Sequence, residues 1–459
     1  MDASCSQAEL MLHPDLTLKC YIEIPEYIKH PLEVNDSQYD ASNNVTVETY
    51  TFSAQFWPKK YMDSHGRLWQ HKLVIYRPDS IKTDEALLYV NGGTRYLNLQ
   101  GDNFKPRQMD FSRIASITHS VVVDLEDVPN QYIAFDDNIP RKEDGLVAYT
   151  WNKYLDDPYK NSYWVLHIPM TKSVILAMDA VQKKQIEKHA KPIRHFVIAG
   201  ASKRGLVAWL SALADSRVNA IIPIVIHELN IQKNLQLIYK SYNGWPQAFS
   251  DYVTQGIPER LNSPAFSKLV KIEDPIAYLS CKNCRHYRTR LSIPKYIISA
   301  SSDDFFVPDS PNLYLGQLPG EALLRVMPNQ GHTIDSNMLE NAILEGYQSI
   351  VNHIQRPRLT WKVDSSGLLS MIYTNIKPEK IVLWESNNTK SRDFRRSSNV
   401  VYSEKDLSTK LVRHQYEVVP GISTAFDGWK ADFVELTYKL QYGNSITITS
   451  PVYIMKNNK

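Results

Sequence analysis

The sequence predicts an α/β fold, with a mostly parallel sheet flanked by helices, followed by a β-sandwich. Between residues 49 and 226, apolar runs of strand length alternate with helical segments, which is typical of βαβ units. The segment 229–290, rich in Tyr, Trp and Asn, interrupts this alternation and is expected to form a cap. Beyond residue 358 the pattern changes to short alternating strands. We therefore expect an α/β domain at 1–356 and a β-sandwich of the immunoglobulin or fibronectin kind at 357–459.

Each expected element rests on its pattern of apolar residues. Ala86–Asn91 and Thr118–Asp124 are strand-sized apolar runs, which suit buried parallel strands. Thr171–His189 carries its apolar residues on one helical stripe. Further strands are expected at 50–57, 72–76, 195–199, 218–226, 296–300 and 323–327, a helix at 203–214, and tail strands at 359–363, 380–384, 429–438 and 445–449.

The composition is that of a globular protein. Of 459 residues, 43% are hydrophobic and 22% charged, and the net charge is +3. So small an excess of positive charge predicts neither a nucleic acid nor an anionic membrane as partner. No apolar run approaches the roughly 18 residues that a membrane span needs, and the first residues lack the basic and apolar regions of a signal peptide.

Ser202 lies between a predicted strand and a predicted helix, in the sequence Gly-Ala-Ser-Lys-Arg-Gly at 200–205. A nucleophilic serine on such a sharp turn needs small neighbours, because the backbone is strained there. The second glycine of the usual G-x-S-x-G pattern is replaced by Arg204. The alternative is a plain turn of small residues, but the flanking strand and helix favour a nucleophile.

An acid and a histidine follow Ser202 in the order that this kind of site requires. Asp303 and Asp304 come directly after a predicted strand, and His332 comes after the next one, 29 residues beyond Asp303. We favour Asp303 over Asp304 as the acid that orients His332, and expect Asp304 to line the site. The alternative for His332 is a surface loop histidine.

Backbone donors for a developing oxyanion are expected from two places. One is the N–H of Lys203, and the other is the glycine pair Gly92 and Gly93, whose alternative role is an ordinary turn. Polar loop residues after an earlier strand are predicted to line the substrate site: Glu126, Asn130, Gln131, Glu143, Asp144 and Trp151. Glu143 and Asp144 fit a substrate amine, or alternatively the solvated start of a helix.

No metal or cofactor is predicted. His227-Glu228 resembles the start of a zinc-protease helix, but position 231, where the second histidine belongs, is Ile231. The cysteines Cys5 and Cys20, and Cys281 and Cys284, fit two short disulfides or four free thiols. A zinc site from all four is disfavoured, because a second close pair is missing.

These motifs resemble the PhoPQ-activated pathogenicity-related proteins, whose relatives include a secreted proliferation repressor of social amoebae. The resemblance runs from about Thr49 to the C-terminus and implies an α/β-hydrolase fold and export, but little about substrate. In that family the second acid of the pair at 303–304 is often Glu, which supports Asp303, and the position of His227 usually carries an acid. The matching segments are 128–131, 141–144, 148–151, 169–173, 200–205, 222–226 with 229–230, 303–309, 326–332 and 433–436.

The sequence therefore predicts a serine hydrolase that cleaves an ester or amide, including a peptide bond, through Ser202, His332 and Asp303. The substrate is expected to be a small ester or peptide. The alternative is a secreted binding or signalling protein on a hydrolase scaffold, linked to virulence or growth control, whose tail binds a protein or glycan.

Overall fold

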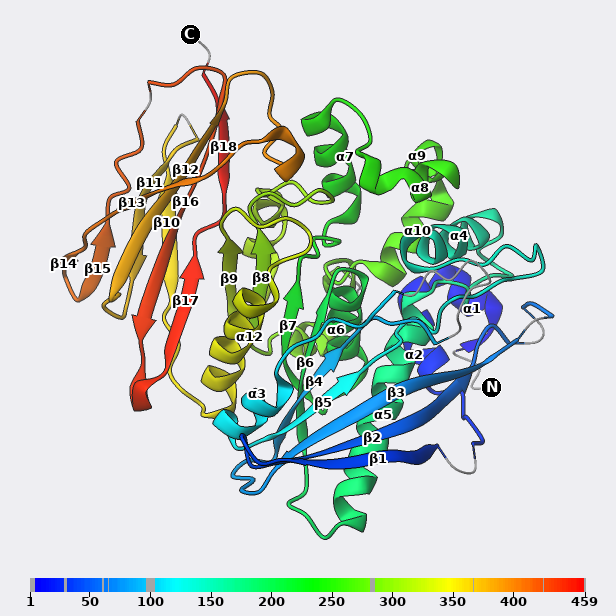
Figure 1. The fold of residues 1–459 in the computed structure, drawn as a ribbon. Coiled ribbons are helices and arrows are strands. Elements are labelled where there is room, and N and C mark those ends of the chain that lie inside the picture. Colours follow the sequence, from blue (N-terminus) through cyan, green and yellow to red (C-terminus); the bar gives the residue numbers. More distant parts are fainter. Residues whose placement is uncertain are drawn as a thin grey trace. The chain divides into compact units, whose positions relative to one another are not determined.

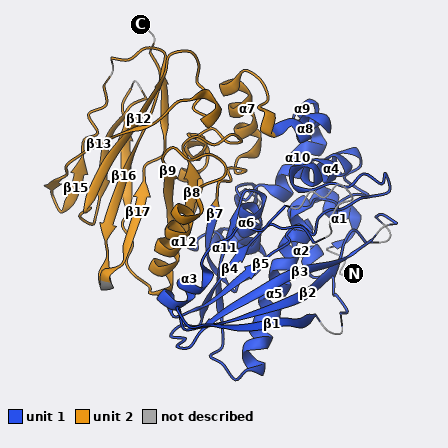
Figure 2. Cartoon of the chain, in the orientation of Figure 1, with its two compact units in different colours: residues 1–223, 249–293 blue, residues 224–248, 294–459 orange. Residues whose placement is uncertain are grey.

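The computed structural model describes residues 5–28, 31–59, 62–64, 66–95, 104–280, 285–365, 367–423 and 425–457. The chain forms two compact units, drawn in different colours in Figure 2. Unit 1 holds residues 1–223 and 249–293, and unit 2 holds residues 224–248 and 294–459. The fold is of the α/β class, with mostly parallel central strands and antiparallel sheets in the tail, as predicted.

The sheet of unit 1 combines an antiparallel edge with a parallel centre (Figure 1). Its strand order is β1-β2-β3-β5-β4-β6-β7. Strand β1 pairs with β2, β2 with β3 and β3 with β5, and all three pairs are antiparallel. Strand β4 pairs in parallel with β5 and with β6. The parallel strands β4 and β5 are buried throughout, as their apolar sequences require. The strand bounds are β1 (Leu32–Asp40), β2 (Val45–Phe56), β3 (Leu68–Pro78), β4 (Glu85–Val90), β5 (Val121–Leu125), β6 (His195–Ala201) and β7 (Val218–Ile224).

Helices cover this sheet and continue into the predicted cap. Helix α6 packs against β6 and against α5, while α3 packs against β3 and β5. Within unit 1, α8, α9 and α10 pack against α4. The bounds are α1 (Gln7–Leu12), α2 (Thr17–Ile22), α3 (Phe111–Thr118), α4 (Glu143–Asp156), α5 (His167–Glu187), α6 (Lys203–Ala214), α8 (Ser250–Thr254), α9 (Ile257–Arg260), α10 (Pro264–Glu273) and α11 (Arg285–Arg290).

Unit 2 joins two parallel strands to the tail. Strands β8 (Lys295–Ala300) and β9 (Ala322–Met327) pair in parallel, and the Val225 N–H donates to the Ile298 carbonyl at 2.8 Å. The unit also contains α7 (Ile231–Tyr242) and α12 (Ser336–Val351). The tail strands are β10 (Leu359–Val363), β11 (Leu369–Thr374), β12 (Lys380–Asn388), β13 (Ser403–Asp406), β14 (Lys410–Val412), β15 (Gln415–Val418), β16 (Trp429–Lys439), β17 (Ser445–Thr449) and β18 (Tyr453–Lys456).

The tail is a sandwich of two antiparallel sheets. One has the order β10-β11-β15-β14, and the other has β13-β12-β16-β17 with β18 beside β16. Side chains connect the sheets, since the Tyr438 hydroxyl donates to Thr374 Oγ1 at 2.9 Å and Trp361 Nε1 donates to the Tyr453 hydroxyl at 2.5 Å.

The compact units do not follow the predicted boundary at residue 357. Strand β17 of the tail packs along β9, where the Val326 N–H donates to Thr449 Oγ1 at 3.1 Å. The Tyr296 hydroxyl on β8 likewise donates to the Thr447 carbonyl at 2.7 Å. These bonds explain why β8, β9 and the tail form one compact unit.

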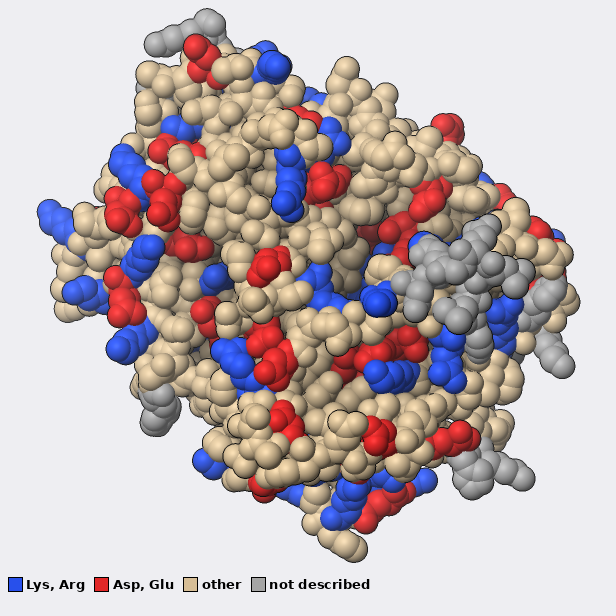
Figure 3. All heavy atoms as spheres, in the orientation of Figure 1, with Lys and Arg blue, Asp and Glu red and all other residues tan. Residues whose placement is uncertain are grey.

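A disulfide joins Cys5 to Cys20 within unit 1, and the second predicted pair, Cys281 and Cys284, lies outside the described residues. In the described part of the chain, no helix is long and apolar enough to cross a membrane. Acidic and basic side chains are mixed over the face drawn in Figure 3.

Candidate active site

Ser202 has the strained backbone expected of a serine on a nucleophile turn. Its φ is 57° and its ψ is −131°, a combination that L-residues rarely adopt. The turn is tight because β6 runs directly into α6, and a Cβ on Gly200 would lie only 2.5 Å from the Arg204 carbonyl oxygen. Only glycine fits there. The sequence thus forces Ser202 to stand at the junction between strand and helix.

The Lys203 N–H, which directly follows Ser202, is placed differently from the N–H groups after it. The N–H groups of Gly205 and Leu206 donate to the Ser202 carbonyl, at 2.7 and 3.2 Å. In the described chain the Lys203 N–H has no such acceptor, as expected in the first turn of a helix. This donor and the positive end of α6 favour a developing oxyanion beside Ser202.

The glycine pair after β4 packs tightly against its neighbours. Gly93 has a φ of 140°, and a Cβ there would lie 2.2 Å from Asp127 Oδ1. A Cβ on Gly92 would meet Phe104 at 2.5 Å and the Arg204 guanidinium at 3.0 Å. Gly93 therefore requires glycine, a Cβ at position 92 would need the Phe104 ring to move, and Arg204 links this loop to the first turn of α6.

Glu143 and Asp144 hold cations of this chain, in place of the substrate amine considered above. Lys203 Nζ donates to Glu143 Oε2 at 2.8 Å and to Asp144 Oδ2 at 3.1 Å. Arg204 also pairs with Glu143, and its Nε donates to the Val128 carbonyl at 2.5 Å. Lys203 and Arg204 are 5% and 6% exposed, so these pairs lie in the interior.

The charges of this cluster stabilise one another. Burial alone would raise the pKa of Glu143, but Arg204 and Lys203 together lower it well below its ordinary range. Burial would lower the pKa of Lys203, but Asp144 and Glu143 raise it. Glu143 therefore stays ionised and Lys203 protonated at neutral pH.

Gln131 connects the ion cluster to the glycine loop. Its Nε2 donates to the Gly93 carbonyl and to Glu143 Oε1, both at 2.9 Å, and its Oε1 accepts from the Glu143 N–H at 2.9 Å. Asn130 donates to the Gln70 carbonyl. Both amides are buried, at 0% and 1% exposure, so they act as supports for the loop and present no open surface.

Trp151 and Glu126 also have partners within unit 1. Trp151 is 2% exposed and its Nε1 donates to Glu273 at 2.7 Å, which puts the ring inside the helical layer instead of on a rim. Glu126 pairs with Lys72 at 3.0 Å. Sequence position alone indicated neither partner, because each lies more than fifty residues away.

In unit 2, Asp303 and His332 form a hydrogen-bonded pair. Nδ1 of His332 lies 3.0 Å from both carboxylate oxygens of Asp303. Asp303 Oδ1 also accepts the N–H groups of Phe305 and Phe306, at 2.7 and 3.2 Å, and the residue is 2% exposed. The side chain of His332 is 19% exposed and packs 4.4 Å from the Phe305 ring. A carboxylate fixed in this way holds the imidazole in one orientation.

Asp304 is not the partner of His332. Burial and the neighbouring Asp303 charge raise the pKa of Asp304, and Arg395 opposes them. Of the two candidate acids, the structure brings Asp303 to His332.

His227 supports the same region and was not predicted to do so. Its Nδ1 lies 2.8 Å from the Tyr314 hydroxyl, and its Nε2 lies 2.9 Å from Ser299 Oγ. Its ring meets Phe306 edge-on at 5.5 Å. Burial lowers the pKa of His227 to about 4, so the ring is neutral. The described residues hold no cluster of three or more His, Cys, Asp or Glu side chains that fits a metal.

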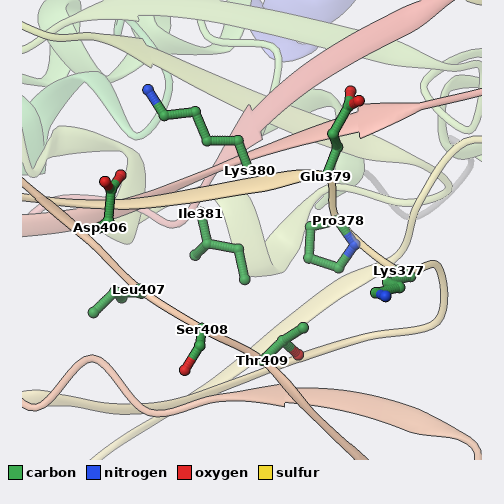
Figure 4. Close-up of a pocket in the computed structure, with 9 residues that line it drawn as sticks. All are labelled: Lys377, Pro378, Glu379, Lys380, Ile381, Asp406, Leu407, Ser408 and Thr409. Carbon is green, nitrogen blue, oxygen red and sulfur yellow. The ribbon is translucent and has the colours of Figure 1, made fainter.

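The tail contains a pocket of about 420 Å³. Figure 4 shows its lining, which comes from two segments around the start of β12 and the end of β13. Pro378 and Ile381 form its buried floor, while its charged side chains are exposed. Its lining contains no histidine and no buried ionisable side chain. The lining residues are Lys377, Pro378, Glu379, Lys380, Ile381, Asp406, Leu407, Ser408 and Thr409.

The turn at Ser202, within a mostly parallel sheet, belongs to the α/β-hydrolase fold class. The family described as PhoPQ-activated pathogenicity-related protein matches residues 18–395, well over half of the chain. This protein therefore belongs to that family, as its motifs predicted. A curated relative, the autocrine proliferation repressor protein A of Dictyostelium discoideum, is 32% identical over 475 residues, which cover 95% of this chain and 90% of the relative.

Solved structures similar to this chain include two esterases. An acetyl xylan esterase from Paenibacillus sp. R4 has a TM-score of 0.45 and 14% identity, over 76% of this chain and 96% of that one. A glucuronoyl esterase from Solibacter usitatus has a TM-score of 0.43 and 12% identity, over 75% of this chain and 91% of that one.

Proposed function

We propose that this protein is a serine hydrolase that cleaves a small ester or a peptide amide. The observation that carries the proposal is the strained turn at Ser202, with φ 57° and ψ −131°. Such strain persists only where the surrounding structure holds it, and it clusters at functional sites. The hydrogen-bonded pair of Asp303 and His332 supports the proposal, because a serine hydroxyl needs a base and that base needs an orienting acid.

In the proposed reaction, Ser202 Oγ attacks the carbonyl carbon while its proton passes to His332 Nε2. The C–O or C–N bond then breaks, and His332 gives the proton to the leaving alcohol or amine. Water then attacks the acyl-enzyme while His332 takes one of its protons, and His332 gives that proton to Ser202 Oγ as the C–O bond to Ser202 breaks and the acid leaves. The N–H groups of Lys203 and Gly93 stabilise the oxyanion, and Asp303 holds His332 in the required tautomer.

Hydrolysis of 4-methylumbelliferyl acetate and of short peptide amides tests the proposal. Ser202→Ala is expected to lower kcat/KM by at least about 10³-fold, and Asp303→Asn by a comparable factor. Ser211→Ala is the matched control, because Ser211 is a buried serine further along α6. Folded Ser202→Ala protein with wild-type activity would refute the assignment.

A second candidate function is signalling without catalysis, which the name of the amoebal relative favours. Signalling that survives Ser202→Ala would favour this candidate. We also propose export, because the disulfide between Cys5 and Cys20 suits an oxidising compartment.

A further inference from the structure

The loop between β12 and β13 in the tail packs against the segments that carry Asp303 and His332 (Figure 1). Two reciprocal hydrogen bonds hold it there, since Asn329 Nδ2 donates to the Tyr402 carbonyl at 3.0 Å and the Tyr402 N–H donates to Asn329 Oδ1 at 2.8 Å. The Arg396 N–H donates to the Ser302 carbonyl at 3.1 Å. The tail therefore supplies a fixed wall beside His332.

This loop carries three arginines, and two of them pair with other side chains of unit 2. Arg392 pairs with Asp309 and donates to Ser241 Oγ at 2.7 Å. Arg395 makes two bonds to Asp393, at 2.9 and 2.6 Å, and its guanidinium lies 4.0 Å from the centre of the Tyr242 ring. Both cations hold the loop and are not available to a ligand.

Arg396 differs from these two. It is exposed, and no acidic side chain pairs with it in the described part of the chain. Its Cδ lies 3.8 Å from the place where a Cβ on Gly331 would stand, and Gly331 directly precedes His332. Asp304 Oδ2 also lies 3.8 Å from that place, but it forms no ion pair with Arg396 among the described residues. The Arg396 side chain, which pairs with no acid among the described residues, thus lies beside the residue that precedes the proposed base.

We propose that Arg396 binds a carboxylate on the leaving group of the substrate, so that the enzyme prefers esters whose alcohol portion is anionic. This inference rests on the proposed function. The leaving group is the part that His332 protonates, so a cation beside His332 faces that part. A guanidinium can donate two parallel hydrogen bonds to the two oxygens of a carboxylate.

Two esters that differ only in charge test the inference: 4-acetoxybenzoate, which is anionic, and its neutral methyl ester. The readout is the ratio of the two kcat/KM values, anionic over neutral. A charge-assisted hydrogen bond predicts a ratio of about 10 for the wild type, after correction for the reactivities of the two phenols in buffer. The ratio is expected to fall towards 1 in Arg396→Gln, to recover in part in Arg396→Lys, and to shrink with added salt.

The matched control is Arg413→Gln, which removes an exposed arginine from the turn between β14 and β15 and should keep the wild-type ratio. Hydrolysis of both esters with a corrected ratio near 1, or a ratio unchanged by Arg396→Gln, would overturn the inference and leave the hydrolase assignment intact. Failure of the folded wild type to cleave either ester would also overturn the inference, whereas the hydrolase assignment is judged separately from 4-methylumbelliferyl acetate and the peptide amides.

Discussion

Replacing Glu143 with Ala tests whether the ion cluster beside Ser202 stabilises the fold. Glu143 pairs with Lys203 and with Arg204, which are 5% and 6% exposed, and it also accepts from Gln131 at 2.9 Å. Breaking a buried ion pair from one side costs about 3 to 5 kcal/mol, because a buried charge loses its partner. Lys203 keeps Asp144 at 3.1 Å, so we expect the lower end, about 3 kcal/mol.

Thermal unfolding followed by circular dichroism measures this loss. For a unit of this size, about 3 kcal/mol corresponds to a decrease in Tm of the order of 10 °C. Glu259→Ala, which removes an exposed glutamate from α9, is the control and should change stability by less than about 0.5 kcal/mol. A decrease in Tm for Glu143→Ala no larger than that of the control would mean that the ion cluster does not stabilise the fold.

Three further changes have expected outcomes of known sign. Ser202→Gly should be more stable than Ser202→Ala by about 1 kcal/mol in chemical unfolding, because only glycine adopts a φ of 57° with a ψ of −131° without strain. Gly200→Ala should cost at least about 2 kcal/mol, because its Cβ would lie 2.5 Å from the Arg204 carbonyl oxygen. Asp432→Asn should stabilise the protein at pH 7 by about 2 to 4 kcal/mol, because burial raises the pKa of Asp432 to about 8.

The sign for Asp432 follows from proton binding. Between about pH 4 and pH 8 the Asp432 carboxyl is ionised in the unfolded chain but protonated in the folded chain. Its contribution to the free energy of unfolding therefore falls as pH rises. Asp427→Asn, at an exposed position, is the control. An advantage of Asp432→Asn that does not grow from pH 4 to pH 8 would contradict this assignment.

Controls for the other two changes use positions with opposite geometry. Ser211 lies inside α6, so the Ser211→Gly variant should be less stable than the Ser211→Ala variant. Gly316 has no atom within 4 Å of an added Cβ, so Gly316→Ala should be nearly neutral. Equal stabilities for the two Ser202 variants, or equal effects at Gly200 and Gly316, would mean that local strain and crowding are not the cause.

The elements with strong apolar patterns could be predicted closely from the sequence. Helix α6 and strand β17 begin and end at the predicted residues. Strand β10 does so too, although it is mostly exposed. Strand β1 was not predicted, because it is an exposed edge strand whose polar sequence shows no alternation of buried and exposed residues. The exposed tail strand β13 escaped prediction for the same reason.

The residues of the candidate site were predictable where they belong to local sequence motifs. Ser202 directly follows β6, Asp303 and His332 lie in the loops after β8 and β9, and the turn at Ser202 needs its small neighbours. The pairing of Glu143 with Lys203 and Arg204 and the position of the loop of Arg396 were not predictable, because they depend on contacts between segments 60 or more residues apart. No local pattern encodes such contacts, and only the fold reveals them.

The most direct test of the central claim is labelling of the folded protein with a fluorophosphonate, followed by peptide mass spectrometry. We expect one adduct, on Ser202, that is absent in Ser202→Ala and strongly reduced in His332→Ala. An adduct on another residue, or none at all on folded protein, would contradict the assignment of Ser202 as an activated nucleophile.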